Sequence, residues 1–154
     1  MIQLILARHA KSDWADEGLD DHDRPLNDRG RRDAPAMARS VLRRGVRPEA
    51  LLSSTAVRAR STAEAFAEEF EVEVSERPEL YLAEPDTLLE AARMSGAREV
   101  MVVAHDPGMS ELVSRLAERD VRMVTSAVAI FTWHDGEWSN VGSAAPDEFE
   151  LLTP

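Results

Sequence analysis

Short apolar runs alternate along the chain with longer stretches in which apolar residues recur every three or four positions. The runs Gln3–Ala7, Ala50–Ser54 and Glu99–His105 predict strands, and the first and last are apolar enough to be buried on both faces of a parallel sheet. A further segment, Val72–Glu76, alternates between apolar and polar residues as a strand does. Because helical stretches separate these strands, the pattern predicts repeated strand–helix–strand units.

Four helices are predicted between and after the strands. Asn27 is suited to cap a helix that ends near Arg44, and Pro35 inside it predicts a kink or a later start. A second helix spans about Ala56–Phe70, and a third begins at Pro85, a residue favoured at the first helical position, and runs through Met94. The fourth follows the turn "DPG" after the last buried strand.

The C-terminal quarter reads as a hairpin followed by a tail. Ala127–Trp133 and Glu137–Ser143 are its predicted strands, around a turn at His134–Gly136. The acidic tail from Ala144 is expected to be loosely ordered. The whole pattern predicts an α/β fold: a three-layer sandwich with a mostly parallel central sheet, an antiparallel edge strand and helices on both faces.

Length and composition fit a single domain over residues 1–154 with a full core. The absence of cysteine excludes disulfides, thiolate nucleophiles and cysteine-bound metal clusters. No apolar run approaches the roughly 20 residues of a membrane span, and the N-terminus "MIQLILARHA" has no basic leader, so we expect a cytoplasmic protein.

The net charge of −11 narrows the choice of partners. An acidic surface repels nucleic acid and anionic membranes at long range, so neither is an expected partner. It also repels phosphorylated molecules. Any phosphate site must therefore be a local cluster of arginines within an acidic field.

Four polar residues stand where predicted strands end. Arg8 and His9 follow the first strand, His105 closes the "VMVVA" strand, and Arg58 lies in the first turn of the helix after "LLSS". In an open α/β sheet, ligands bind beyond the carboxyl ends of the strands. We therefore expect these four side chains to meet at one edge of the sheet.

Their chemistry suits the transfer of a phosphoryl group. Two guanidinium groups can hold its oxygens through paired hydrogen bonds, and helix N-termini behind Arg58 and after Gly108 add partial positive charge. A neutral imidazole is a competent nucleophile, and neighbouring arginines lower the pKa of His9 and keep it neutral. His105 can donate hydrogen bonds to the transferring group, whose charge is then met from several sides.

Three motifs resemble those of a known family. "RHAKS" resembles the arginine–histidine signature of the histidine phosphatase (phosphoglycerate mutase-like) superfamily, and "SSTAVRARSTAEAF" and "VVAHDPGMSELV" resemble the segments with its second arginine and second histidine. The short chain, "DHDRPLNDRGRRDAPAMA" and "ELYLA" are closer to the SixA-type phosphohistidine phosphatases than to the larger mutases. The resemblance extends from Met1 to about Gly142.

The resemblance implies a role for each of the four residues. His9 would be the nucleophile that is transiently phosphorylated, and Arg8 and Arg58 would bind the phosphoryl oxygens. His105 would stabilise the transition state from the opposite side. The family implies neither a metal nor another cofactor.

Two features depart from the family pattern. The glycine that usually follows the nucleophilic histidine is Ala10 here, whose small side chain should still permit close packing. Larger members carry a glutamate that protonates the leaving oxygen, and here Glu79 and Glu84 are only weak candidates for it. A weak or missing acid suits phosphohistidine, because its leaving imidazole, with a pKa near ~6.5, departs readily once protonated.

For other polar residues near the nucleophile, the sequence allows either a binding role or a structural role. Lys11 and Ser12 either donate to phosphate or belong to a solvated loop, and Arg24 either lines the pocket or pairs with an aspartate of Asp20–Asp23 to hold the loop. That acidic run reads as solvated, because it lacks the spacing of a calcium loop, and no metal site is predicted. The loop Asp13–Leu26 as a whole has no predicted role.

These observations favour a metal-independent phosphatase that works through a phosphohistidine intermediate. The preferred substrate is phosphohistidine on a partner protein, such as a phosphotransfer domain, because a short chain leaves little sequence for a lid over a small substrate. A phosphatase for small phosphate esters is the alternative within the enzyme class. A catalytically silent phosphate-binding or protein-interaction module is the alternative outside it.

Overall fold

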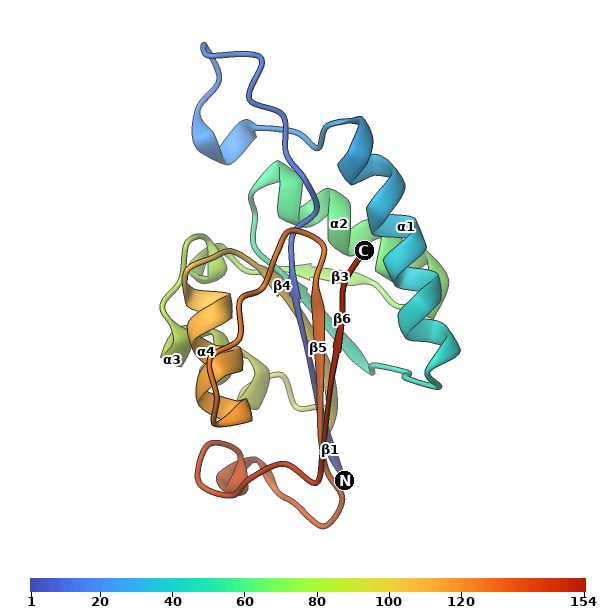
Figure 1. Ribbon diagram of the computed structural model, residues 1–154, viewed down its shortest axis with the longest axis vertical. Helices are drawn as coiled ribbons and strands as arrows, with labels where there is room; N and C mark the ends of the chain where they lie inside the picture. The colour runs from blue at the N-terminus through green and yellow to red at the C-terminus, as the bar shows by residue number, and fades with distance from the viewer.

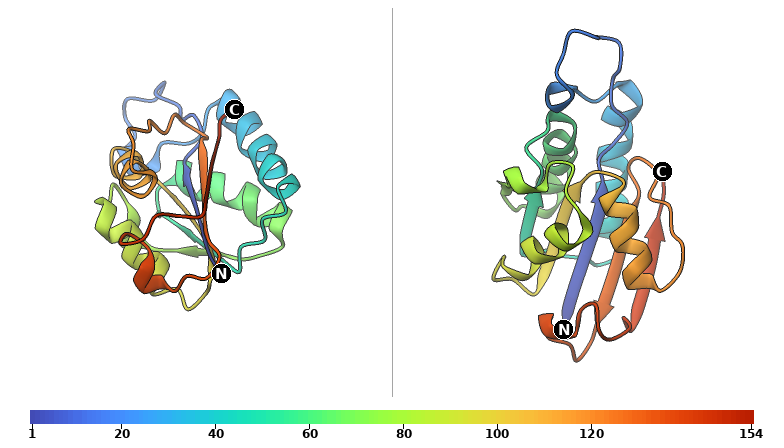
Figure 2. Two further views of the ribbon diagram at one scale, coloured as in Figure 1. Left: turned by 60° about the horizontal axis from the view of Figure 1, so that its bottom comes forward. Right: turned by 90° about the vertical axis from the view of Figure 1, so that its left-hand side faces the viewer.

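The computed structural model describes residues 1–154 and has three layers, with a six-stranded sheet between two pairs of helices (Figures 1 and 2). The strands are β1 (Ile2–Arg8), β2 (Ala50–Ser53), β3 (Val74–Glu76), β4 (Glu99–Ala104), β5 (Val128–Trp133) and β6 (Glu148–Leu152). Their order across the sheet is β3-β2-β4-β1-β5-β6. The first four are mutually parallel, and β5 runs antiparallel to both β1 and β6. The predicted α/β fold class is confirmed.

Two helices cover each face of the sheet (Figure 1). The helices are α1 (Asp28–Arg43) and α2 (Val57–Phe70) on one face, and α3 (Pro85–Arg93) and α4 (Gly108–Ala117) on the other. The Asn27 side chain caps α1 by accepting a hydrogen bond from the Gly30 amide, as predicted. The helix continues through Pro35, so the alternative of a later start is wrong. No helix has the length and apolar character needed to cross a membrane.

Strand alternation divides the hydrophobic core between the two faces of the sheet. Leu4 and Leu6 of β1 pack into a cluster with residues of α3 and α4, whereas Ile5 and Ala7 pack with residues of α1 and α2. All four side chains are fully buried. This two-sided burial explains why β1 reads as a continuous apolar run.

The C-terminal hairpin was predicted correctly only in its first strand. The segment 137–143 forms a 3-10 turn, η3 (Trp138–Asn140), and the strand that pairs with β5 is β6, in the tail expected to be loosely ordered. Phe149 of β6 stacks on Phe131 of β5 with ring centroids 4.7 Å apart. The Trp133 indole donates to the carbonyl of Ala144 and closes the intervening loop. These aromatic contacts outweigh the acidic composition of the tail.

The chain leaves the neighbouring strands β1 and β4 toward opposite faces of the sheet. The chain passes from β1 to α1 on one face, and from β4 to α4 on the other. The register pairs Arg8 with Ala104 and Ser53 with Val103, so the residues that follow all three strands stand at one level. In doubly wound sheets, this kind of divergence leaves a crevice that can bind a ligand.

Candidate active site

His9 is the first residue beyond β1 and is 6% exposed. Its Nδ1 lies 2.7 Å from the Ala10 carbonyl oxygen, which can only accept, so Nδ1 carries the hydrogen and Nε2 carries the lone pair. Burial lowers the pKa of His9 from 6.5 to about 4, the hydrogen bond to Ala10 opposes this, and the charges of Arg58, Arg8 and Arg24 lower the pKa further. The imidazole is therefore neutral at physiological pH.

Two arginines flank this imidazole. Arg58, in the first turn of α2, is 2% exposed, and its Nε lies 3.4 Å from His9 Nε2. Arg8 ends β1; its Nη1 donates to the Met123 carbonyl at 3.0 Å and lies 3.7 Å from an Asp106 carboxylate oxygen. The Nε of Arg8 is buried without a partner, so Arg8 retains a donor for an incoming group.

His105 directly follows β4, and its ring lies 5.3 Å from that of His9 between centroids. Its Nε2 is 2.7 Å from the Ser54 hydroxyl, while its Nδ1 is buried without a partner. Burial lowers the pKa of His105 to about 3, and the charges of His9 and Arg58 act in the same direction, against a smaller opposing effect of Asp21. This second imidazole is neutral as well.

A cavity of about 170 Å³ opens at this edge of the sheet. All seven residues predicted for the site line it: Arg8, His9, Lys11, Ser12, Arg24, Arg58 and His105. Trp14, whose sequence context left open whether it lines the pocket mouth or packs on the loop, lines the cavity too. The other lining residues, which the sequence did not indicate, are Leu82, Asp106 and Thr125. The strand ends and the first turn of α2 thus converge on one hollow, as the strand–turn–helix pattern predicted.

Arg24 has both of the roles that the sequence allowed. Arg24 lines the cavity and also pairs with Asp21, whose Oδ1 accepts from Arg24 Nε at 3.1 Å. Its Nη1 donates to the buried Ser12 hydroxyl at 2.6 Å, and its guanidinium carbon lies 3.4 Å from the ring centroid of Trp14. Most of its donors are therefore used within the protein, and Arg24 supports the cavity wall.

Asp21 is exposed, as expected for the acidic run, but its carboxylate is also paired with arginines of the site. Its carboxylate lies in η1 (Asp21–Asp23), and its Oδ2 accepts from Arg58 Nη2 at 2.9 Å and from the Tyr81 hydroxyl at 2.5 Å. Partial burial works against ionisation, but the hydrogen bonds from Tyr81, Arg58 and Arg24 outweigh it and hold the pKa of Asp21 well below its usual range. Composition does not show which of several neighbouring aspartates meets an arginine distant in sequence.

His22, in the same turn, joins the cluster around Asp21. Its Nε2 is 2.7 Å from the Thr55 hydroxyl, and its ring packs edge-on against Tyr81, with centroids 4.9 Å apart. Tyr81 packs in the same way against His105 at 5.4 Å. An aromatic chain thus links η1 to the second histidine of the cavity.

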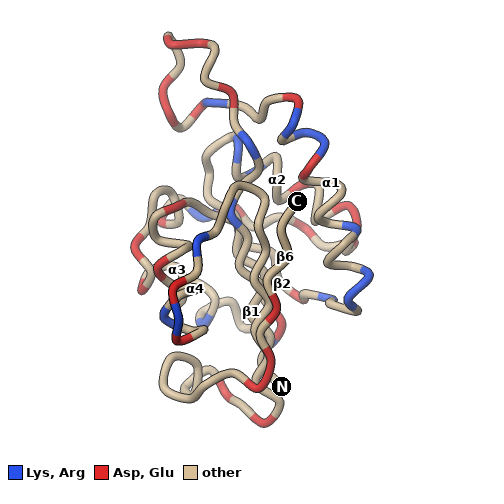
Figure 3. The backbone as a smooth tube through the Cα atoms, viewed as in Figure 1, with Lys and Arg blue, Asp and Glu red and all other residues tan.

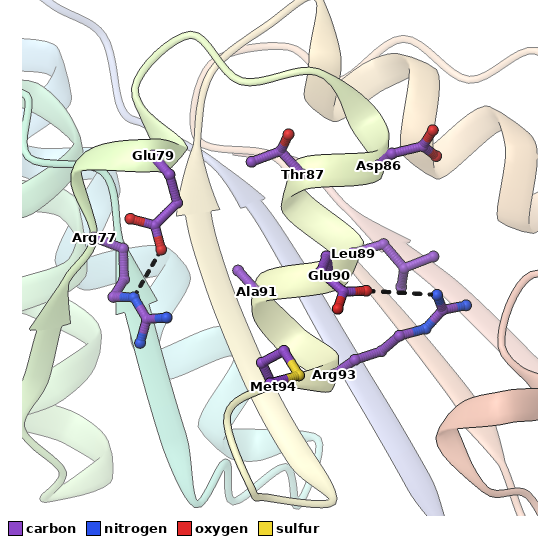
Figure 4. A pocket seen from close by; sticks show the side chains of 9 residues that line it. All are labelled: Arg77, Glu79, Asp86, Thr87, Leu89, Glu90, Ala91, Arg93 and Met94. Atoms are coloured by element: carbon purple, nitrogen blue, oxygen red, sulfur yellow. Dashed lines mark hydrogen bonds and ion pairs between the residues drawn. The ribbon is translucent and has the colours of Figure 1, made fainter.

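Neither glutamate considered as a proton donor reaches the cavity. Glu79 is exposed and accepts a hydrogen bond from Arg77 at 2.9 Å, beside a separate surface pocket along α3 (Figure 4). A hydrogen bond from its own backbone amide and the contact with Arg77 lower the pKa of Glu79. Glu84 is exposed at the start of α3. The cavity around His9 therefore receives no glutamate from this region.

Comparisons with known proteins agree with this geometry. An uncharacterised protein of Mycobacterium tuberculosis is 36% identical over 148 residues, covering 87% of this chain and 90% of that relative. The structure is similar to those of the proposed phosphohistidine phosphatases SixA from Agrobacterium tumefaciens (TM-score 0.85, 29% identity, 99% of this chain and 98% of that chain) and from Nakamurella multipartitia (TM-score 0.84, 26% identity, 99% and 96%). A family model for the histidine phosphatase superfamily (branch 1) matches residues 4–81. The chain therefore belongs to the histidine phosphatase superfamily and is of the SixA type.

Proposed function

We propose that this phosphatase acts, without a metal ion, through a phosphohistidine intermediate at His9, and that its substrate is phosphohistidine on a partner protein. One observation carries the proposal: the Nε2 lone pair of His9 accepts a hydrogen bond from Arg58 Nε at 3.4 Å, in a cavity that is also lined by Arg8 and His105. A neutral nucleophile and cationic groups for a phosphoryl dianion thus stand together.

In the first step, the Nε2 lone pair of His9 forms a bond to phosphorus while the bond from phosphorus to the substrate imidazole breaks. A substrate imidazole that is already protonated on its other ring nitrogen leaves as neutral imidazole. No acid in the site has to supply a proton at that moment. The hydrogen on Nδ1 of His9 stays on its bond to the Ala10 carbonyl and stabilises the charge that develops on the ring.

In the second step, water attacks phosphorus and the bond from phosphorus to Nε2 of His9 breaks. The electron pair returns to Nε2, and the hydrogens of the water remain on the phosphate product or pass to solvent. His9 leaves as neutral imidazole, because Nδ1 still carries its hydrogen. Both steps therefore break the same type of bond, and the same surroundings serve both.

The two arginines and His105 are proposed to hold the phosphoryl oxygens. We assign the 2.7 Å contact between Ser54 and His105 as a hydrogen bond from the Ser54 hydroxyl to Nε2 of His105, while the hydroxyl oxygen accepts from the Ala56 amide. On this assignment, Nδ1 of His105 carries a hydrogen that has no partner in the protein. It is an available donor for a phosphoryl oxygen.

The carboxyl groups near the cavity favour phosphohistidine over phosphate esters. An alcohol is a poor leaving group and needs a proton donor, but Asp21 is held ionised by its arginine contacts. The oxygens of Asp106 accept hydrogen bonds from the amide and the hydroxyl of Ser110. The carboxylates of Asp21 and Asp106 are therefore both engaged as hydrogen-bond acceptors within the protein.

The test compares substrates and one variant. The protein is incubated with a histidine-phosphorylated phosphotransfer domain and with a chromogenic phosphate ester, in parallel with His9→Ala. We expect release of phosphate from the phosphoprotein at least about ten times faster than from the ester, and no release by the variant. Faster turnover of the ester would overturn the choice of substrate. Binding of both compounds without hydrolysis would identify a silent module instead.

A further inference from the structure

The carboxylate of Asp21 connects three side chains at the edge of the cavity. One oxygen accepts from Arg24, and the other accepts from Arg58 and from the Tyr81 hydroxyl. We propose that Asp21 is a positioning residue of the phosphatase site, which holds the far end of the Arg58 guanidinium so that its Nε edge faces His9. This inference rests on the proposed function and assigns a role to a residue that does not itself line the cavity.

The donors of Arg58 are divided between Asp21 and the cavity. Nη1 donates to the Asp21 backbone carbonyl at 2.7 Å, and Nη2 donates to the Asp21 carboxylate at 2.9 Å. Nε points toward His9 Nε2 at 3.4 Å. A guanidinium has five N–H groups in one rigid plane, so anchoring both terminal nitrogens fixes the direction of the remaining hydrogens. Those hydrogens are available to a phosphoryl group on His9.

Burial makes this anchor necessary. The Arg58 side chain is 3% exposed, and Asp21 is its ion-pair partner. A buried guanidinium without a counter-charge is strongly destabilised and would turn toward solvent or another acceptor. The Asp21 side chain keeps 43% exposure, so it loses less hydration than a fully buried carboxylate would. The partly hydrated Asp21 carboxylate thus holds the buried Arg58 guanidinium in place.

Asp21 is itself held by hydrogen bonds, since no residue of η1 is buried. Arg24 approaches it from the other side, anchored in turn by the Ser12 hydroxyl and by the ring of Trp14. Tyr81 completes the set at 2.5 Å. The contacts form a continuous chain from the Asp13–Leu26 loop to Arg58, which gives that loop a role at the nucleophile.

The alternative role for Asp21 is that of an intramolecular competitor, whose carboxylate occupies Arg58 in place of the substrate. An Asp21 carboxylate that occupied Arg58 only until a phosphoryl group displaced it would weaken oxyanion binding, and its removal would tighten that binding. The positioning role predicts the reverse sign, because a loosened Arg58 binds an oxyanion less well. Binding of orthovanadate, a pentacoordinate phosphate mimic, therefore separates the two roles without any turnover.

The experiment uses Asp21→Asn, which keeps the backbone carbonyl and the shape of the side chain. Asp23→Asn is the matched control, because this residue lies in the same turn and its side chain forms an ion pair with His22 alone, at 3.5 Å. We expect Asp21→Asn to lower kcat/KM and to weaken orthovanadate binding by about 10- to 100-fold, the usual effect of losing a charged hydrogen bond. The control should change both by less than about two-fold. Unchanged or tighter orthovanadate binding by Asp21→Asn would overturn the positioning role.

A double-mutant cycle shows whether Asp21 acts through Arg58. In an Arg58→Lys background, Asp21→Asn should have less than about a two-fold further effect, because lysine cannot reproduce the anchored fork. If the double variant lost kcat/KM by the product of the two single-variant factors, Asp21 would act independently of Arg58 and the proposal would be contradicted. Tyr81→Phe removes one neutral donor from the same carboxylate and keeps the ion pairs. We expect Tyr81→Phe to lower kcat/KM by about 2- to 10-fold. This variant tests the same carboxylate if the Asp21→Asn protein does not fold.

The two proposals fail in different ways. A wild-type protein that hydrolyses no phosphorylated substrate contradicts the proposed function, whereas the orthovanadate comparison still tests Asp21. An active wild-type protein whose Asp21→Asn and Tyr81→Phe variants keep full activity contradicts the positioning role alone.

Discussion

At the scale of single residues, the protonation state of His9 decides whether it can act as a nucleophile. The side chain is almost fully enclosed, and three arginines lower its pKa in addition to burial. Protonation would place a cation among cations and remove the lone pair on Nε2. The same surroundings that bind an anion therefore keep the nucleophile uncharged.

This state can be measured directly by following the imidazole ring protons of His9 by NMR between pH 4 and 8. Because its pKa is lowered from 6.5 to about 4, His9 should stay neutral down to at least about pH 5 and titrate below it. His9→Gln identifies the signal. A titration midpoint near pH 6.5 would show that the ring is neither buried nor flanked by arginines in solution.

Residues that follow regular strands could be placed from the sequence alone. Arg8, His9 and His105 come together because parallel strands end at one edge, and that rule needs only the order of apolar runs. Asp21 and Tyr81 could not be placed in this way. Their contact joins positions 60 residues apart through irregular turns, whose path in space depends on tertiary packing.

At the scale of elements, the first turn of α1 packs directly on the segment that follows the nucleophile. A Cβ atom added at Gly30 would lie 2.2 Å from the Lys11 carbonyl oxygen. Such a contact forces the backbones apart. The close approach of α1 therefore helps to hold the segment between His9 and Ser12, which adjoins the cavity.

Gly30→Ala is expected to lower the free energy of unfolding by about 1–3 kcal/mol, as overpacking does, even though alanine favours helix. Chemical denaturation measures the effect. Arg32→Ala, at an exposed position of the same helix, is the control and should change stability by less than about 0.5 kcal/mol. Equal stabilities of the two variants would mean that α1 does not pack closely on Lys11.

The elements predicted best are those whose burial is two-sided or whose ends are capped. The strands from Ile2 to Arg8 and from Glu99 to Ala104 are continuous apolar runs, and Asn27 marks the start of α1. The C-terminal segment was predicted incorrectly. The sequence "EWSNVGS" alternates like a strand yet forms η3, and the strand "EFELL" lies in an acidic tail. The strand "EFELL" is stabilised by its pairing with β5 and by the contact of Phe149 with Phe131, which are both tertiary and cannot be read from local sequence.

At the scale of the whole molecule, a cationic cavity lies within a strongly acidic chain. The net charge is −11, and acidic residues are spread along the backbone, including the loop between β1 and α1 that projects beyond the sheet (Figure 3). Long-range repulsion disfavours free small anions, whereas a partner protein with basic residues around its phosphohistidine would be attracted. The overall charge thus agrees with the proposed choice of a protein substrate.

The proposed mechanism requires a covalent phosphoryl group on Nε2 of His9, which can be trapped. A radiolabelled histidine-phosphorylated protein is mixed with the enzyme and quenched within milliseconds in alkali, with and without EDTA. We expect transient label on the enzyme that survives alkali, is lost in acid and maps to the peptide containing His9. The label should be absent from His9→Ala and unchanged by EDTA. Turnover without any such label, or undiminished turnover by His9→Ala, would contradict this mechanism.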